Sequence, residues 1–115
     1  MSEYFLKVMP DYYSSGLWDQ NDEGCMTELR DHIEVNEEVI LLENDLLNWN
    51  KKYDETISWC TDHSNSNFDW VSFHKEGLAL AQRIKKIMGP NGKVIYFKER
   101  NRNTGTKSET ILIQD

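Results

Sequence analysis

The stretch from Asn36 to Cys60 contains the strongest structural pattern in the chain. Apolar residues recur in it every three or four positions, which places them on one face of an α-helix: Val39, Leu42, Leu46, Trp49, Tyr53, Ile57 and Cys60. Asn36 precedes the pattern, and an asparagine side chain can accept a hydrogen bond from a free N–H group of a first helical turn. Glu37 and Glu38 follow, where the helix dipole favours carboxylates. We therefore predict an amphipathic helix that begins just after Asn36.

A second amphipathic helix is expected after a short polar connector. Ser66 and Asp69 form an S-x-x-D capping box at its start, and the Gly-Pro pair at 89–90 is a typical helix end. Its predicted apolar face comprises Trp70, Phe73, Gly77, Leu80, Ala81, Ile84, Ile87 and Met88. Gly77 lies inside this helix, where glycine costs roughly 1 kcal/mol relative to alanine, so we expect a neighbouring element to approach closely there. The short connector predicts that the two helices lie antiparallel.

Three segments have the composition of β-strands. Tyr4–Met9 is rich in aromatic and apolar residues, which favours a strand inside a sheet. Lys93–Arg100 and Ser108–Ile113 flank a glycine-containing turn, a pattern typical of a β-hairpin. The polar residues from Asp11 to Gly24 are expected to form a loop, and Cys25–Val35 is expected to be a short helical turn or irregular chain.

Together these elements predict an α+β fold in a single domain, residues 1–115. The N-terminal strand and the C-terminal hairpin would form a small antiparallel sheet, and the two antiparallel helices would cover it, in the order β-α-α-β-β. This arrangement is the simplest way to bury every apolar stripe.

Charge is distributed unevenly along the chain. The formal net charge is −7, but residues 1–62 have a balance of −11 and residues 63–115 have a balance of +4. An acidic surface repels nucleic acid, which is itself a polyanion, and attracts basic proteins. We therefore expect a basic protein partner and no direct contact with nucleic acid. A surface that only keeps the protein soluble is the simpler alternative.

The acidic half also contains aromatic residues in a polar loop. Such residues either pack back onto the core or are presented to a partner, where Trp and Tyr are enriched, and the sequence leaves both options open. The candidate partner-binding residues are Asp11, Tyr12, Tyr13, Trp18, Asp19, Asp22, Glu23, Glu28, Asp31 and Glu34.

Catalytic and metal-binding patterns are weak throughout the sequence. Cys60-x-x-His63 is half of a zinc spacing without a matching second pair, and Asp19-x-Asn21-x-Glu23 resembles only the start of a calcium loop. Residues 62–64 are triad types, but sequence neighbours cannot converge as a triad does. We predict no enzyme activity, no metal and no cofactor.

The location expected for this protein is the cytoplasm. The sequence has no run of about 18 apolar residues that would span a membrane, and its N-terminus lacks the pattern of a signal peptide. Its two cysteines do not form a disulfide framework. The sequence makes no prediction about oligomeric state.

Several short packing patterns resemble those of small immunity proteins from bacterial contact-dependent growth inhibition systems. They are Gly16-Leu17-Trp18-Asp19, Leu46-Leu47-x-Trp49-x-x-x-Tyr53-Asp54, Phe68-Asp69, Gly77-Leu78-x-Leu80-Ala81 and Val94-x-Tyr96. The resemblance implies a non-enzyme that binds the toxic C-terminal domain of a cognate effector and blocks it in the cytoplasm of the producing cell. Such toxins are frequently nucleases, and no family motif fixes the binding residues.

Other functions remain open at this point. An acidic protein that mimics DNA and inhibits a DNA-binding or restriction enzyme would also use carboxylates in place of phosphates. The net positive C-terminal half argues against a continuous anionic surface of that kind. A small enzyme and an adaptor domain are the remaining alternatives.

Overall fold

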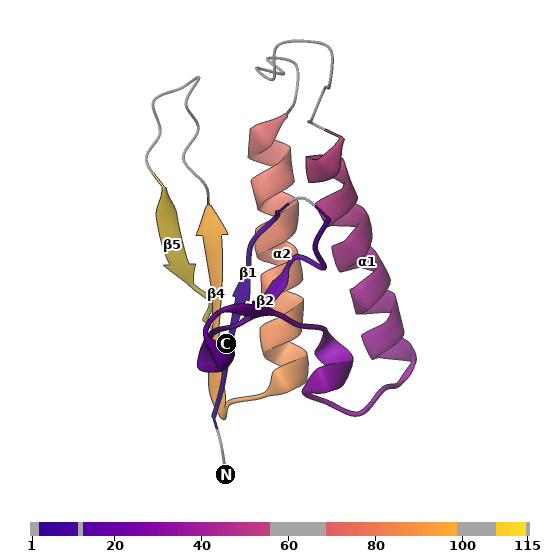
Figure 1. Ribbon diagram of the computed structural model, residues 1–115, viewed down its shortest axis with the longest axis vertical. Helices are drawn as coiled ribbons and strands as arrows, with labels where there is room; N and C mark the ends of the chain where they lie inside the picture. The colour runs from indigo at the N-terminus through magenta and orange to yellow at the C-terminus, as the bar shows by residue number, and fades with distance from the viewer. Residues whose placement is uncertain (1–2, 12, 56–68, 99–107, 115) are drawn as a thin grey trace.

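The computed structural model describes residues 3–11, 13–55, 69–98 and 108–114. Two helices lie side by side against one face of a twisted sheet (Figure 1). The elements are β1 (Tyr4–Val8), β2 (Leu17–Asp19), η1 (Gln20–Asp22), β3 (Cys25–Met26), η2 (Leu29–Asp31), α1 (Glu37–Asp54), α2 (Trp70–Met88), β4 (Gly92–Lys98) and β5 (Glu109–Leu112), where η denotes a 3₁₀-helix. The α+β class and the two covering helices are confirmed.

The sheet is mixed, so the predicted antiparallel sheet is wrong in one pairing. The strand order is β3-β2-β1-β4-β5, and the central β1 pairs antiparallel with β2 but parallel with β4. The predicted hairpin of β4 and β5 is confirmed, as is the interior position of β1. The predicted order β-α-α-β-β omitted β2 and β3, which interrupt the segment predicted as loop and irregular chain. β1 and β4 run parallel over five residue pairs, from Tyr4↔Gly92 to Val8↔Tyr96.

Both helices begin at a capping side chain. The Asn36 side chain accepts a hydrogen bond from the Val39 N–H at 2.9 Å, as predicted. The start predicted for the second helix was wrong, because Asp69 is the N-cap and its carboxylate accepts from the Ser72 N–H. Ser66, the later part of the first predicted helix and the hairpin turn lie outside the described residues.

The antiparallel arrangement of the helices is confirmed by two ion pairs between them. Asp45 pairs with Arg83 at 2.8 Å, and Lys52, later in α1, pairs with Glu76, earlier in α2, at 2.8 Å. The partners run in opposite directions along the chain, as antiparallel packing requires. Both pairs are exposed, so each contributes little to stability.

Trp49 occupies the centre of the core, where both helices meet the sheet. Its indole N–H donates to the Phe73 carbonyl at 2.9 Å, and its ring stacks on the Phe73 ring with centroids 4.8 Å apart. A Cβ on Gly77 would lie 2.6 Å from both Trp49 Cζ2 and Tyr96 Cε1. The close approach predicted at Gly77 is confirmed, because only a glycine leaves room for these two rings.

Replacing Gly77 with alanine tests this packing. The added methyl group has no space, so we expect the Gly77→Ala variant to lose roughly 1–3 kcal/mol of unfolding free energy, although alanine is the better helix former. Urea denaturation would measure the loss. The exposed α2 substitution Gln82→Ala is the control and should change stability by less than about 0.5 kcal/mol. Equal stability of Gly77→Ala and wild type would contradict the packing described here.

A buried histidine was not predicted from the sequence. His74 is 7% exposed, and its Nδ1 lies 2.6 Å from the Tyr96 hydroxyl oxygen. Burial, assisted by the charge of Lys98, lowers the pKa of His74 to about 4. Burial also raises the pKa of the Tyr96 hydroxyl above its usual range. Both groups are therefore neutral in the folded protein near pH 7.

The depressed pKa of His74 makes stability depend on pH. Above about pH 6.5 this histidine is neutral in both the folded and the unfolded state. Between 6.5 and about 4 the unfolded chain takes up a proton that the folded chain excludes, so stability falls as the pH falls. We expect His74→Gln to flatten the slope in this interval by at most about 1.4 kcal/mol per pH unit. Denaturation at several pH values measures the slope, and identical slopes for variant and wild type would contradict the expectation.

Candidate functional site

The segment that leads from β2 to α1 is the most acidic part of the molecule. Between Asp19 and Glu43 the chain has nine carboxylates and one arginine. Figure 1 shows this segment crossing from the sheet, through η1 and η2, to the start of α1. Two of the nine, Glu37 and Glu38, lie in the first turn of α1 and are both exposed. The segment therefore concentrates negative charge at the end of the molecule where α1 begins.

Side-chain hydrogen bonds fix the backbone of this acidic segment. The Asp19 carboxylate accepts from the Asn21 N–H at 3.0 Å and so caps η1. The Asp31 carboxylate accepts from the Thr27 hydroxyl and from the Glu28 N–H, each at 3.1 Å. These contacts hold the two short helical turns in place, so the exposed carboxylates project from an ordered surface.

Arg30 joins η2 to α1. Its guanidinium donates to the Glu43 carboxylate from Nε at 3.1 Å and from Nη2 at 2.7 Å, and its backbone N–H also donates to Glu43. The hydrogen bond from Arg30 lowers the pKa of Glu43, and the same bond raises the pKa of Arg30. The Glu43 side chain is only 15% exposed. The contact with Arg30 covers most of this carboxylate.

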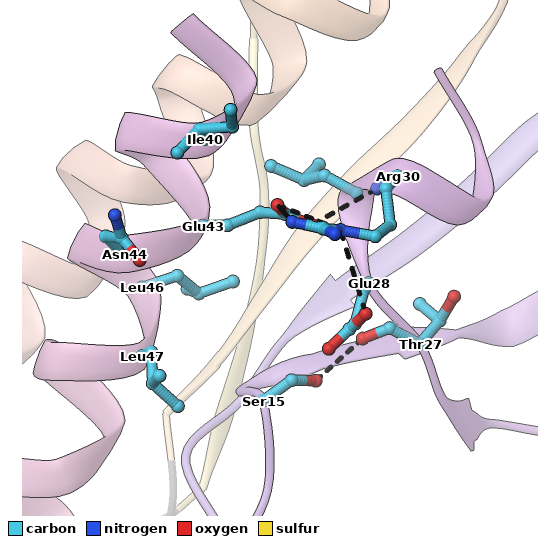
Figure 2. A pocket seen from close by; sticks show the side chains of 10 residues that line it. Ser15, Thr27, Glu28, Arg30, Ile40, Glu43, Asn44, Leu46 and Leu47 are labelled. Carbon is cyan, nitrogen blue, oxygen red and sulfur yellow. Dashed lines mark hydrogen bonds and ion pairs between the residues drawn. The ribbon is translucent and has the colours of Figure 1, made fainter. Parts of the chain in front are cut away.

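A hollow of about 160 Å³ lies between η2 and α1. Figure 2 shows Ile40 and Leu47 on the α1 side, Glu28 and Thr27 on the opposite side, and the Arg30–Glu43 pair between them. Leu29 and Leu46 also line it, and both are buried. Ile40 is 44% exposed and Leu47 is 43% exposed, so both present apolar surface at the hollow. The hollow thus combines apolar walls with an acidic rim.

Six of the ten candidate residues lie on this acidic segment. The exposed members are Asp22, Glu23, Glu28, Asp31 and Glu34. Asp19 belongs to the same segment but is partly covered, and its carboxylate lies 3.9 Å from His32 Nε2. These six residues form the acidic surface, the name used below.

The other candidates lie elsewhere. The Asp11 N–H donates to the buried Asn50 side chain, and the Tyr13 N–H donates to the Asp54 carboxylate. Asn50 and Asp54 both belong to the last turns of α1. Asn50 and Asp54 lie roughly 10 and 16 Å further along α1 than Glu43, which contacts η2. Tyr13 is 78% exposed, whereas Tyr12 lies outside the described residues.

Trp18 lies on the sheet face that points away from the helices. It pairs with Lys7 of β1, whose neighbours Leu6 and Val8 face the core. The indole N–H donates to the Met9 carbonyl at 3.0 Å, and the residue is partly buried. Trp18 is therefore held against the outer face of the sheet, next in the chain to Asp19.

Two features of the site had no clear signal in the sequence. The Arg30–Glu43 pair joins residues that are 13 positions apart, and the hollow beside it needs η2 to pack on α1. The buried amide of Asn50, which accepts from the Asp11 N–H and donates to the Ser14 carbonyl, was also missed. A single arginine within a run of nine acids is the one indication that the sequence offers.

Metal and membrane sites were also considered. In the described ranges no group of three or more His, Cys, Asp or Glu side chains is placed to hold a metal ion. None of the helices described here is both long enough and apolar enough to cross a bilayer. The arrangement instead provides an ordered acidic surface with an apolar hollow, which suits the binding of a protein.

Comparison with known families assigns the chain to the immunity proteins of bacterial toxin systems. A family model described as Serratia CdiI immunity protein-like matches residues 5–99. Since the match covers most of the chain, the protein belongs to this family. The resemblance to contact-dependent growth inhibition immunity proteins is thereby confirmed, and the alternative of a DNA mimic is not favoured. No curated protein and no solved structure gave a significant match.

The Arg30–Glu43 pair predicts a specific response to acid. The lowered pKa of Glu43 stabilises the fold above the ordinary pKa of a glutamate, about 4.3, and this contribution is lost as the pH falls through the depressed value. We expect Glu43→Gln to be less stable than wild type at pH 7, with a smaller difference at pH 3. Thermal unfolding at both values measures it, and a difference independent of pH would contradict the assigned role.

Proposed function

We propose that this protein binds the toxic C-terminal domain of a cognate contact-dependent growth inhibition effector and neutralises it in the cytoplasm of the cell that makes both. Family membership supports this proposal, since the family is described as immunity protein-like. In this role the protein acts by binding and needs no catalysis and no cofactor.

The proposed partner is a basic toxin domain, most simply a nuclease. A nuclease must hold phosphates, so its active cleft is positively charged. The observation that supports this partner is the excess of nine carboxylates over one arginine between Asp19 and Glu43. Carboxylates on an ordered surface can take the place of phosphates in such a cleft, and they also accelerate encounter with a basic partner.

We place the toxin-binding site on the acidic surface. Asp22 and Glu23 are exposed at η1, and Glu28 and Asp31 are exposed at η2. Asp11 and Tyr13 lie further along α1, beside its last turns. A typical interface buries about 800 Å² on each partner, so these residues and Trp18 are candidates for its edge.

Charge reversal tests the site. We expect the double substitution Asp22→Lys and Glu23→Lys to weaken binding of the toxin domain encoded immediately upstream by at least about tenfold. The salt dependence of the affinity should also become shallower, because fewer opposite charges meet. Titration calorimetry at two salt concentrations measures both quantities, and survival of cells that co-express toxin and variant measures protection.

The control reverses two exposed acids elsewhere, Glu55→Lys and Glu109→Lys. This control changes the net charge by the same amount as the substitutions at Asp22 and Glu23. A difference in toxin affinity between the two double variants therefore depends on the position of the charges and not on the total charge. If both bind the toxin equally well, the acidic surface is not the binding site. If the wild-type protein neither binds nor protects, the proposed function itself fails.

A further inference from the structure

We propose that the hollow between η2 and α1 receives one long cationic side chain of the toxin, an arginine or a lysine. This inference rests on the proposed function and refines it, since it names one contact within the acidic surface. The aliphatic part of that side chain would lie against Ile40 and Leu47, and its charged head would reach the Glu28 carboxylate (Figure 2).

The size of the hollow admits a single side chain. Its volume is about 160 Å³, and a cavity of about 150 Å³ holds a benzene molecule. Sites for small-molecule ligands usually measure about 300–1,000 Å³. A cofactor or metabolite is therefore a poor fit, whereas one anchoring residue from a protein partner fits well.

The walls suit the stem of a long cationic residue. Arginine and lysine cover apolar surface with their methylene groups while their charged heads stay near polar groups. Ile40 and Leu47 are each more than 40% exposed and offer such a surface. Burying them against a stem in the complex would remove apolar area from water, which favours binding.

The rim selects for positive charge. The guanidinium of Arg30 donates short hydrogen bonds to Glu43 and also forms a longer ion pair with Glu28, with Nε 4.0 Å from Oε2 (Figure 2). The Glu28 side chain is 58% exposed. Two carboxylates share one guanidinium here, so the rim of the hollow has a net negative charge. An incoming guanidinium or ammonium could form a charge-assisted hydrogen bond there.

The experiment uses the full-length protein and the toxin domain encoded immediately upstream. Glu28→Gln removes the rim charge and keeps the shape, and Glu55→Gln removes one exposed charge at the other end of α1. Asn44→Trp fills the hollow from its α1 side, and Asn48→Trp adds the same bulk one turn further along, away from the lining. Dissociation constants are measured for the four variants and the wild type, with circular dichroism to confirm folding.

The expected result is that Glu28→Gln and Asn44→Trp each raise the dissociation constant by about tenfold or more, while Glu55→Gln and Asn48→Trp stay within about threefold of wild type. Equal affinities for Asn44→Trp and Asn48→Trp would overturn the proposal, because the hollow would then be empty in the complex. A loss with Asn44→Trp but none with Glu28→Gln would show an apolar occupant and overturn the cationic one.

A double-mutant cycle identifies the partner residue. Glu28→Gln is combined with alanine substitutions of each arginine and lysine in the toxin domain, and one of them should show a coupling of about fivefold or more. The absence of any coupled residue would overturn the proposal. In both cases wild-type binding and protection persist, so failure here is distinct from failure of the proposed function.

Discussion

The contact between the Trp49 ring and the bare backbone of Gly77 determines how the helices sit on the sheet. Trp49 belongs to α1, Gly77 to α2 and Tyr96 to β4, so three elements meet at one point. Any side chain at Gly77 would push these three elements apart. The hydrogen bond from the Trp49 indole to the Phe73 carbonyl fixes the rotation of α1 about its own axis. Protein cores pack as densely as crystals, so this junction allows little displacement of either helix.

The orientation of α1 in turn positions η2 and its share of the acidic surface. With Trp49 and Leu46 directed into the core, the helical period directs Glu43 and Leu47 toward η2. Glu43 then anchors Arg30, and the two residues hold η2 and its exposed carboxylates at a fixed distance from the helix. A site attached in this way to a rigid helix binds with less loss of conformational entropy than a mobile loop would.

Local signals in the sequence were sufficient to predict the helices. The pairing of strands that lie far apart in the chain could not be predicted from such signals. The apolar period, the Asn36 cap and the glycine at position 77 each act over a few residues, and each prediction held. The parallel pairing of β1 with β4 joins residues that are 88 positions apart, and the three residues of β2 are too few to show an alternating pattern.

The same limit applied to the site and to one helix end. The acidic character of the site was visible in composition, whereas the hollow depends on a contact between η2 and α1 that no local pattern encodes. At the start of α2, both Ser66 and Asp69 are capping residues by type. The backbone conformation, which composition does not specify, decides in favour of Asp69.

Among the described residues, several positive charges of the C-terminal half are engaged away from the acidic surface. Lys85 is 6% exposed, and its ammonium donates to the Gly89 carbonyl and the Tyr4 hydroxyl. Arg83 pairs with Asp45, and Lys93 lies over the Phe5 ring on the outward face of the sheet. Exposed charges further apart than about 8–10 Å are largely screened at physiological salt. A chain with a modest net charge can therefore present a strongly negative surface at one end, and the placement of its bases makes that possible.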